Sequence, residues 1–133
     1  MTEHDSEAVV RHFYEAFLQQ DFDALSQVIS EDAEWHVTGR SRLSGVHKGR
    51  EAIFAFLRQF KELSGGTFKP FGPDTYDICT SEYHVVLMDR FIAKLNGKTL
   101  DSHEVVVVHF KDGQAKTFLH YFFDQYAFDD FWE

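Results

Sequence analysis

The sequence predicts an α+β fold in which three helices precede a meander of long antiparallel strands. Apolar side chains recur at helical spacing in the first half of the chain, whereas the second half consists of segments rich in Val, Phe, Tyr and Thr. Asn96-Gly97 and Asp112-Gly113 separate these segments and are dipeptides typical of tight β-hairpin turns. The chain has 133 residues and no internal repeat, so we treat residues 1–133 as a single domain.

The three helices follow one another along the first half of the chain. Ser6 is placed to cap the first of them. Asp21 is placed to cap a second, shorter helix whose apolar face extends to Ile29. The third helix is expected to begin near Arg50 and to end at Gly65-Gly66, because glycine commonly ends helices.

Strand-like composition occurs on both sides of the third helix. Before it, 33–38 is predicted to be a short strand and 39–49 a loop. Near the C-terminus, Phe128, Phe131 and Trp132 recur at helical spacing and indicate a short closing helix. The long strand-like segments are 67–79, 82–95, 99–111 and 115–126.

Charge and cysteine content exclude several classes of partner. With 13 Lys and Arg against 22 Asp and Glu, the formal net charge is −9, which disfavours nucleic acids and anionic membrane surfaces. No apolar run approaches the roughly 18 residues of a membrane-spanning helix. The N-terminus is acidic and polar, unlike a signal peptide, and Cys79 is the only cysteine. We therefore expect a cytoplasmic protein without an internal disulfide.

Aromatic residues are unusually abundant. The chain contains 15 Phe, 5 Tyr and 2 Trp, or 17% of its residues. A small domain with this much ring area has either a very aromatic core or a cavity lined with rings.

Strand alternation places four ionisable side chains on faces that otherwise look buried: Asp89, Glu104, His120 and Asp124. Burying a charge is costly, so these groups need partners. One interpretation is catalytic, with His120 as a base or proton shuttle, Asp124 as the group that orients it, and Asp89 as an acid. The other is structural, with His120 and Asp124 bonding to each other or to backbone and sealing the fold.

The same alternation defines an inner wall and an outer face. The wall residues line a pocket in one interpretation and are plain core in the other. The outer face is apolar in a chain too short to cover it, which favours a homodimer through the sheet. The expected pocket-lining residues are Trp35, Val37, Phe91, Glu104, Val106, Phe118 and Phe122, and the outer-face residues are His103, Val105, Val107, Leu119, Tyr121 and Phe123.

Other candidate sites carry weaker signals. The basic residues of 40–50 precede a helix, where they could bind an anion or form a solvated rim. No pair among the eight histidines has close metal-ligand spacing; His103 and His109 are six residues apart, about 20 Å along an extended strand. We therefore expect no metal and no other cofactor. The basic cluster is Arg40, Arg42, His47, Lys48 and Arg50.

Four segments resemble the nuclear transport factor 2-like superfamily, specifically its SnoaL-like and ketosteroid isomerase-related branch. They are QDFDAL at 20–25, EDAEW at 31–35, GVHKGREAI at 45–53 and FKDG at 110–113. The resemblance covers nearly the whole chain. It implies a cone-shaped α+β barrel in which three N-terminal helices pack on a strongly curved antiparallel sheet with a mixed edge, around a deep apolar pocket, and a homodimer joined through the sheet.

The resemblance does not extend to the ketosteroid isomerase mechanism. Aligned locally, that family's Asp base, Tyr and Asp acid fall on Val37, Phe13 and Val106, and two further tyrosines fall on Ile29 and Leu57. All five positions are apolar here, so we exclude that mechanism. The resemblance instead implies a SnoaL-like enzyme for acid–base chemistry (isomerisation, cyclisation, dehydration or hydrolysis) on a small, partly apolar organic substrate. The alternative is a non-catalytic small-ligand-binding or structural dimeric domain.

Overall fold

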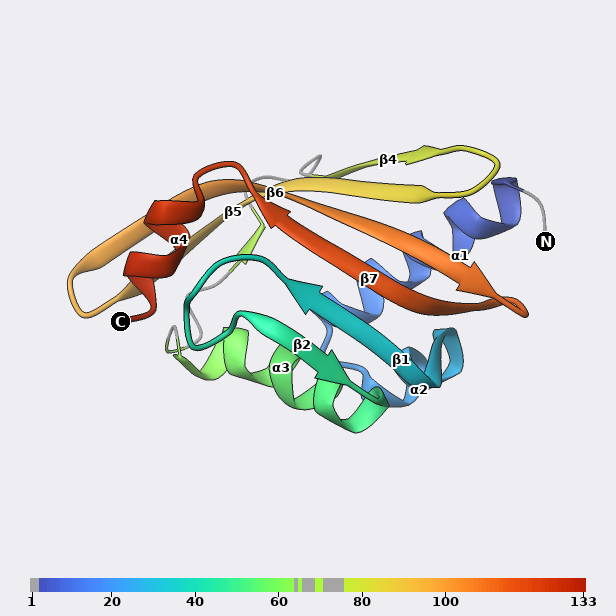
Figure 1. Ribbon diagram of the computed structural model, residues 1–133, viewed down its shortest axis with the longest axis horizontal. Coiled ribbons are helices and arrows are strands. Elements are labelled where there is room, and N and C mark those ends of the chain that lie inside the picture. Colours follow the sequence, from blue (N-terminus) through green and yellow to red (C-terminus); the bar gives the residue numbers. More distant parts are fainter. Residues whose placement is uncertain (1–2, 64, 66–68, 71–75) are drawn as a thin grey trace.

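The computed structural model describes residues 3–63, 65, 69–70 and 76–133, and it is an α+β fold as the sequence predicts (Figure 1). A curled sheet carries helices on one face. In chain order the elements are α1 (Glu3–Leu18), α2 (Phe22–Val28), β1 (Ile29–Val37), β2 (Gly45–Lys48), α3 (Arg50–Leu63), β3 (Lys69–Pro70), β4 (Tyr76–Thr80), β5 (Val85–Leu95), β6 (Lys98–Lys111), β7 (Gln114–Phe122) and α4 (Gln125–Phe131).

The seven strands form one mixed sheet in the order β2-β1-β7-β6-β5-β3, and β4 also pairs with β5. Every pairing is antiparallel except that of β1 with β7, which is parallel. The two predicted hairpins are confirmed. Asn96 and Gly97 have φ of 50° and 77°, and Asp112 and Gly113 have φ of 54° and 80°. Positive φ at both central residues is the signature of the type I′ turn, which matches the twist of the flanking strands.

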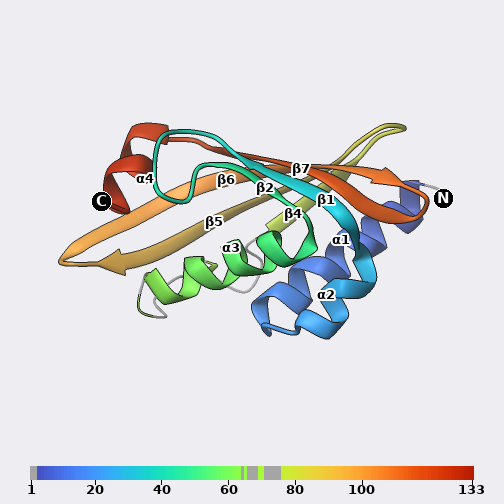
Figure 2. The same cartoon turned by 60° about the horizontal axis from the view of Figure 1, so that its bottom comes forward.

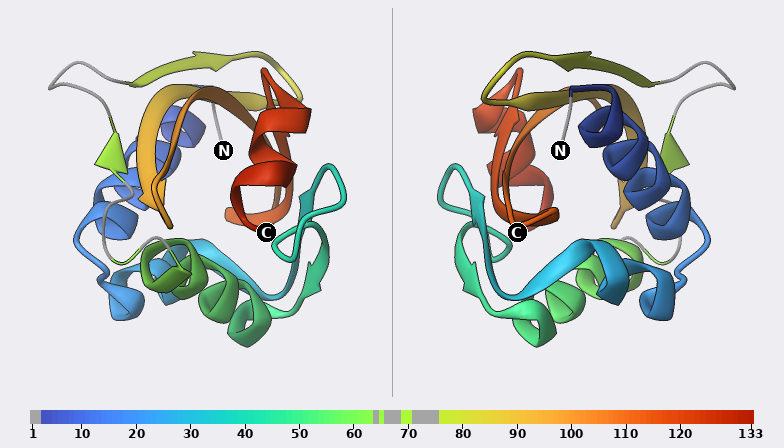
Figure 3. Two further views of the ribbon diagram at one scale, coloured as in Figure 1. Left: turned by 90° about the vertical axis from the view of Figure 1, so that its left-hand side faces the viewer. Right: turned by 90° about the vertical axis from the view of Figure 1, so that its right-hand side faces the viewer.

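The helices and the curled sheet together enclose the core (Figure 3). Helix α1 contacts β4 and β5, α2 contacts β1 and β7, and α3 contacts β1 and β2. Figure 2 shows these three helices on one side of the sheet. Helix α4 closes one end against β6 and β7, and its Phe128 ring stacks on Phe122 at 3.6 Å between centroids. The arrangement confirms the expected three helices on a curved sheet and the closing helix.

Several element boundaries differ from the predictions because tertiary pairing outweighs local pattern. Ser6 lies inside α1, which begins at Glu3, and does not cap it. Ile29 belongs to β1, not to the second helix, because it pairs with Ala115 of β7. The predicted loop 39–49 contains β2, whose extended backbone pairs with β1 from Glu34 opposite Lys48 to Val37 opposite Gly45.

The predicted strands 67–79 and 115–126 also have different bounds in the structure. Within the first, the described residues form β3 and β4, which extends to Thr80, and residues 67–68 and 71–75 lie outside the described residues. The second ends at Phe122, because Asp124 caps α4 and the chain turns into that helix. At the end of α3, Gly65 has φ of 61° and its N–H donates to the carbonyl of Glu62, while Gly66 lies outside the described residues.

Among the described residues, no helix combines the length and the apolar character needed to cross a membrane.

Candidate active site

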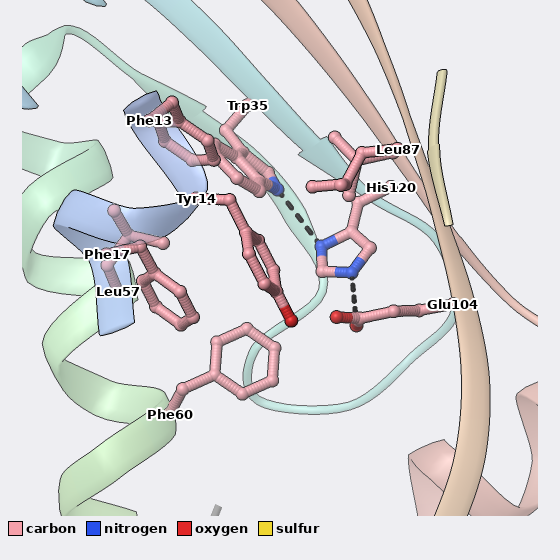
Figure 4. Close-up of a pocket in the computed structure, with 10 residues that line it drawn as sticks. Phe13, Tyr14, Phe17, Trp35, Leu57, Phe60, Leu87, Glu104 and His120 are labelled. Atoms are coloured by element: carbon pink, nitrogen blue, oxygen red, sulfur yellow. Dashed lines mark hydrogen bonds and ion pairs between the residues drawn. The ribbon is translucent and has the colours of Figure 1, made fainter. Parts of the chain in front are cut away.

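Three neighbouring strands bring an indole, an imidazole and a carboxyl group into one buried row (Figure 4). His120 of β7 lies between Trp35 of β1 and Glu104 of β6. The indole Nε1–H of Trp35 donates to His120 Nδ1 at 3.2 Å, and His120 Nε2 is 2.7 Å from Glu104 Oε2. The contact depends on the parallel pairing, since Trp35 and Val37 of β1 lie opposite Phe118 and His120 of β7.

The row continues through Asp89 of β5 to Tyr14 of α1. Asp89 and Glu104 are directly opposite one another on their antiparallel strands, and their carboxyl groups are hydrogen-bonded. The Tyr14 hydroxyl donates to Asp89 Oδ2 at 2.6 Å. Side chains from five elements thus form a continuous polar row inside an apolar core.

Burial dominates the electrostatics of this row. Asp89, Glu104 and His120 are only 7%, 8% and 3% exposed. Desolvation, and then the charge of Glu104, raises the pKa of Asp89 to about 9, and desolvation raises the pKa of Glu104 to about 7. Desolvation lowers the pKa of His120 to about 3. At neutral pH, Asp89 is therefore a neutral acid and His120 a neutral imidazole.

One oxygen of Asp89 supports the neutral form independently. Tyr14 donates to Oδ2, whereas no N–H or O–H of the described residues donates to the buried Oδ1. An ionised carboxylate would leave charge on this unsolvated oxygen, whereas a protonated carboxyl group can donate its proton to Glu104.

A small cavity of about 30 Å³ lies beside the row. It has room for one or two water molecules. Seven of the ten residues that line it have apolar or aromatic side chains, and the three others are Tyr14, Glu104 and His120. The lining residues are Phe13, Tyr14, Phe17, Trp35, Leu57, Phe60, Leu87, Glu104, Val106 and His120.

The structure places the expected wall residues in two groups. Trp35, Glu104 and Val106 line the cavity together with His120. The others are buried in the core outside this lining, where Phe118 stacks on Trp35 at 4.3 Å between centroids. Those core residues are Val37, Phe91, Phe118 and Phe122.

The prediction that Asp124 orients His120 is wrong. Asp124 is exposed, and its side chain accepts a hydrogen bond from the backbone N–H of Ala127 at 3.0 Å as the N-cap of α4. The prediction assumed that strand alternation continues to Asp124, whereas β7 ends at Phe122. The carboxyl group that contacts His120 belongs to Glu104, which the sequence placed among the pocket walls.

Sequence reasoning missed Tyr14. The local alignment placed the family's helix-one tyrosine on Phe13, the adjacent residue. Helical periodicity holds the signal that could have found Tyr14, because Val10, Phe13, Tyr14 and Phe17 recur at i, i+3, i+4 and i+7 on one face. A tyrosine on the buried face of a helix needs a partner for its hydroxyl, and Asp89 is that partner.

Two members of the basic cluster have structural partners. The Arg50 guanidinium donates to the carbonyl of Ile29 at 2.8 and 3.0 Å. His47 Nε2 lies 3.0 Å from the carbonyl of Leu43, and its ring stacks on Phe56. Within the described part of the chain, no group of three or more His, Cys, Asp or Glu residues is placed to hold a metal ion.

The curled mixed sheet with three helices on one side is the nuclear transport factor 2-like fold of α+β proteins. Residues 10–118 match the SnoaL-like domain, and the chain belongs to that family.

Three relatives illustrate the range of similarity. The structure of Bal32a, from a soil-derived mobile gene cassette, is 37% identical, with a TM-score of 0.91 and 98% of each chain covered. The uncharacterised protein Rv0034 of Mycobacterium tuberculosis is 27% identical over 132 residues, 99% of each chain. A putative polyketide cyclase from Xanthomonas campestris shares the fold at 17% identity, with a TM-score of 0.76 and 98% of each chain covered.

Proposed function

We propose that this chain is a small-molecule enzyme that performs acid–base chemistry on a small, partly apolar organic substrate. One observation carries the proposal: a row of ionisable side chains lies along an aromatic-lined cavity, and burial moves the pKa values of two of its carboxyl groups towards or above neutrality. Neighbouring carboxyl groups with separated pKa values are how an enzyme keeps an acid and a base side by side at one pH.

Asp89 is the acid of this proposal, and Tyr14 connects it to the cavity. Asp89 does not itself line the cavity, whereas Tyr14 does. When a substrate oxygen occupies the cavity, the Tyr14 hydroxyl turns to donate to it, and the protonated Asp89 donates to the Tyr14 oxygen in turn. A neutral carboxyl group in an apolar site is suited to this donation because it carries a proton at neutral pH.

The Glu104–His120 pair is the base. Glu104 has a pKa of about 7, so its carboxylate is available near neutral pH and still binds a proton strongly enough to remove one from a substrate. The 2.7 Å contact to His120 Nε2 orients it. Glu104 thus occupies the position beside His120 that the sequence analysis assigned to Asp124.

The family supports a substrate larger than the cavity. Structures that share this fold include putative polyketide cyclases from Xanthomonas campestris and Streptomyces antibioticus. A cavity of about 30 Å³ is too small for an organic substrate of several rings. The aromatic side chains that line it therefore move when a ligand enters. Cyclisation, isomerisation, dehydration and hydrolysis all need the proton transfers that the row can perform, and the proposal covers this class without selecting one.

Proton abstraction is testable before the substrate is known. We expect the protein to catalyse exchange of acidic C–H protons for deuterium in D₂O in some members of a panel of small aromatic and alicyclic ketones, followed by NMR. Glu104→Gln is expected to slow exchange by about 10²- to 10⁴-fold, the usual contribution of a general base. Asp124→Asn, which keeps the N-cap of α4 and changes no member of the row, is the matched control and retains exchange. Equal exchange by Glu104→Gln and the unaltered protein would contradict the proposal.

One observation favours a second candidate, a non-catalytic ligand-binding or structural domain. The members of the row are bonded mainly to one another, and the cavity they face is small. The exchange experiment separates the two candidates. Panel members that bind, by shifts in the protein spectrum, without exchanging their protons identify a binding domain.

We also propose that a second copy covers the outer face of β6 and β7. Helices α1, α2 and α3 lie on the other face (Figure 2). Tyr121 and Phe123 are 45% and 87% exposed, and Tyr126 at the start of α4 is 85% exposed. A face this apolar fits an isologous dimer, the commonest oligomer of soluble proteins.

Light scattering is expected to give twice the 15.5 kDa mass of the chain at micromolar concentration. Tyr121→Glu is expected to give a monomer, because it buries a charge against its own symmetry mate. Tyr83→Glu is the matched control, since Tyr83 is also an exposed aromatic residue (72%) but belongs to the turn between β4 and β5 and not to β6 or β7. A monomeric unaltered protein would rule out the dimer.

We infer a cytoplasmic setting from the only cysteine. Cys79 is exposed and forms no disulfide. A reducing compartment preserves an exposed thiol of this kind.

A further inference from the structure

The hydrogen bond from Trp35 to His120 fixes where the imidazole carries its proton. An indole Nε1–H is a donor only and has no lone pair with which to accept. Trp35 Nε1 faces His120 Nδ1 at 3.2 Å, so Nδ1 presents its lone pair to the indole and carries no hydrogen. The single ring proton of the neutral imidazole therefore lies on Nε2, which donates to Glu104 Oε2 at 2.7 Å.

This arrangement leaves His120 no nitrogen with which to take up a proton. Nε2 already carries one, and protonation of Nδ1 would set its new N–H against the N–H of Trp35 between two buried side chains. The indole would then be a buried donor without an acceptor, which is costly. Glu104 is the only member of the pair that faces the cavity and still accepts a proton.

Trp35 cannot easily turn away to relieve that conflict. Its side chain is 3% exposed. The indole is stacked on Phe118 at 4.3 Å and 11° between planes, with Phe13 and Phe56 at 5.8 and 5.5 Å between centroids. Packing of this kind holds the donor in one direction.

We propose that Trp35 is a positioning residue that holds His120 in its Nε2–H tautomer and thereby makes Glu104, rather than His120, the base of the pair. The inference rests on the proposed acid–base function and assigns the base within it. The direction of the His120 pKa agrees, since desolvation lowers it. The titratable groups nearest the ring are Glu104 from β6 and Asp89 from β5, with Tyr14 of α1 beyond Asp89, while α3 presents the uncharged rings of Phe56 and Phe60.

The tautomer is measurable by long-range ¹H–¹⁵N NMR on protein labelled at histidine, with the His120 signals assigned by their loss in His120→Gln. Between about pH 5 and 8, we expect a protonated Nε2 and an unprotonated Nδ1 that does not titrate. A proton on Nδ1, or an imidazolium in this range, would overturn the proposal.

Two tryptophan variants separate the indole hydrogen bond from general packing. Trp35→Phe keeps an aromatic ring and removes the N–H, so protonation of Nδ1 no longer breaks a hydrogen bond, and we expect Nδ1 to bind a proton about tenfold more tightly. Trp132→Phe is the matched control, because the buried Trp132 Nε1 has no hydrogen-bond partner among the described residues, and His120 should titrate as in the unaltered protein. The two variants are compared from about pH 3 to 6, a range that spans the shifted His120 pKa, and equal titration of His120 in both would overturn the proposal.

Glu104→Gln provides a second test that does not depend on the folding of Trp35→Phe. A glutamine can accept from Nε2–H or donate to Nε2, so it imposes no tautomer of its own. With Trp35 still in place, we expect His120 to remain in the Nε2–H form. A change to the Nδ1–H tautomer would show that Glu104, not Trp35, sets it.

These measurements need no substrate, so their outcome is independent of the deuterium-exchange experiment. If exchange fails but the tautomer is as expected, the proposed function is wrong and the Trp35–His120 arrangement stands. If exchange is lost in Glu104→Gln while His120 carries its proton on Nδ1, the function stands and Trp35 does not position the base.

Discussion

Replacing His120 with alanine is expected to lower the free energy of unfolding by about 3 kcal/mol, because it removes the partners of two buried groups at once. Glu104 loses the N–H that it accepts, and the Trp35 indole loses its acceptor. The variant also leaves a void among the rings that surround the imidazole, which adds to the cost. Urea denaturation with an unchanged m-value measures the effect.

Two further variants serve as comparisons for His120→Ala. His120→Gln retains polar atoms beside Glu104 and Trp35 and is expected to lose less stability than His120→Ala. His12 is exposed on α1, so His12→Ala should stay within about 0.5 kcal/mol of the unaltered protein. If His120→Ala were as mild as His12→Ala, the buried row would contribute nothing to stability.

Asp89 is expected to make the fold less stable as the pH rises from about 7 to 9. The pKa of Asp89 is about 9 in the folded protein and 3.8 in a free side chain, so between these values the folded state holds a proton that the unfolded state has lost. Each rise in pH therefore favours unfolding, by about 1 kcal/mol per pH unit for one proton. Glu104, with a pKa of about 7, is half ionised at pH 7 and about 90% ionised at pH 8, so above pH 8 the dependence is mainly that of Asp89.

Asp89→Asn is expected to flatten that dependence, since an amide keeps the shape of the protonated acid and cannot ionise. Asparagine also accepts from Tyr14 and donates to Glu104 as the protonated acid does. Asp124→Asn is the control, because Asp124 is an exposed N-cap and asparagine caps helices equally well. Chemical denaturation at several pH values gives the slopes, and parallel curves for Asp89→Asn and the unaltered protein would contradict the prediction.

Sequence patterns predicted the part of this protein that depends on neighbouring residues. The two hairpins follow from dipeptides whose backbone preferences suit type I′ turns. Alternation along β5, β6 and β7 placed Asp89, Glu104 and His120 on the inner face, and all three are buried there. The pattern failed at Asp124 because alternation has meaning only within a strand, and the chain leaves β7 at Phe122.

The remaining part of the site depends on contacts between distant segments. No local signal in the sequence indicates that β1 pairs in parallel with β7, and this pairing sets the Trp35 indole against His120. Tyr14 likewise reaches Asp89 across 75 residues of sequence. The abundant phenylalanines mainly fill the core: Phe56, Phe118 and Phe128 are fully buried, and the cavity beside them is small.

The parallel pairing of β1 with β7 also has a consequence for the newly made chain. Trp35 and His120 are separated by 85 residues, which a ribosome adds in roughly 4 to 17 s. During that interval β1 can pair only with β2, and the edge that β7 will occupy is open together with the apolar residues Trp35 and Val37. Unpaired strand edges of this kind invite association with other chains. Nascent protein arrested before β7 is therefore the form in which we expect chaperone binding or aggregation.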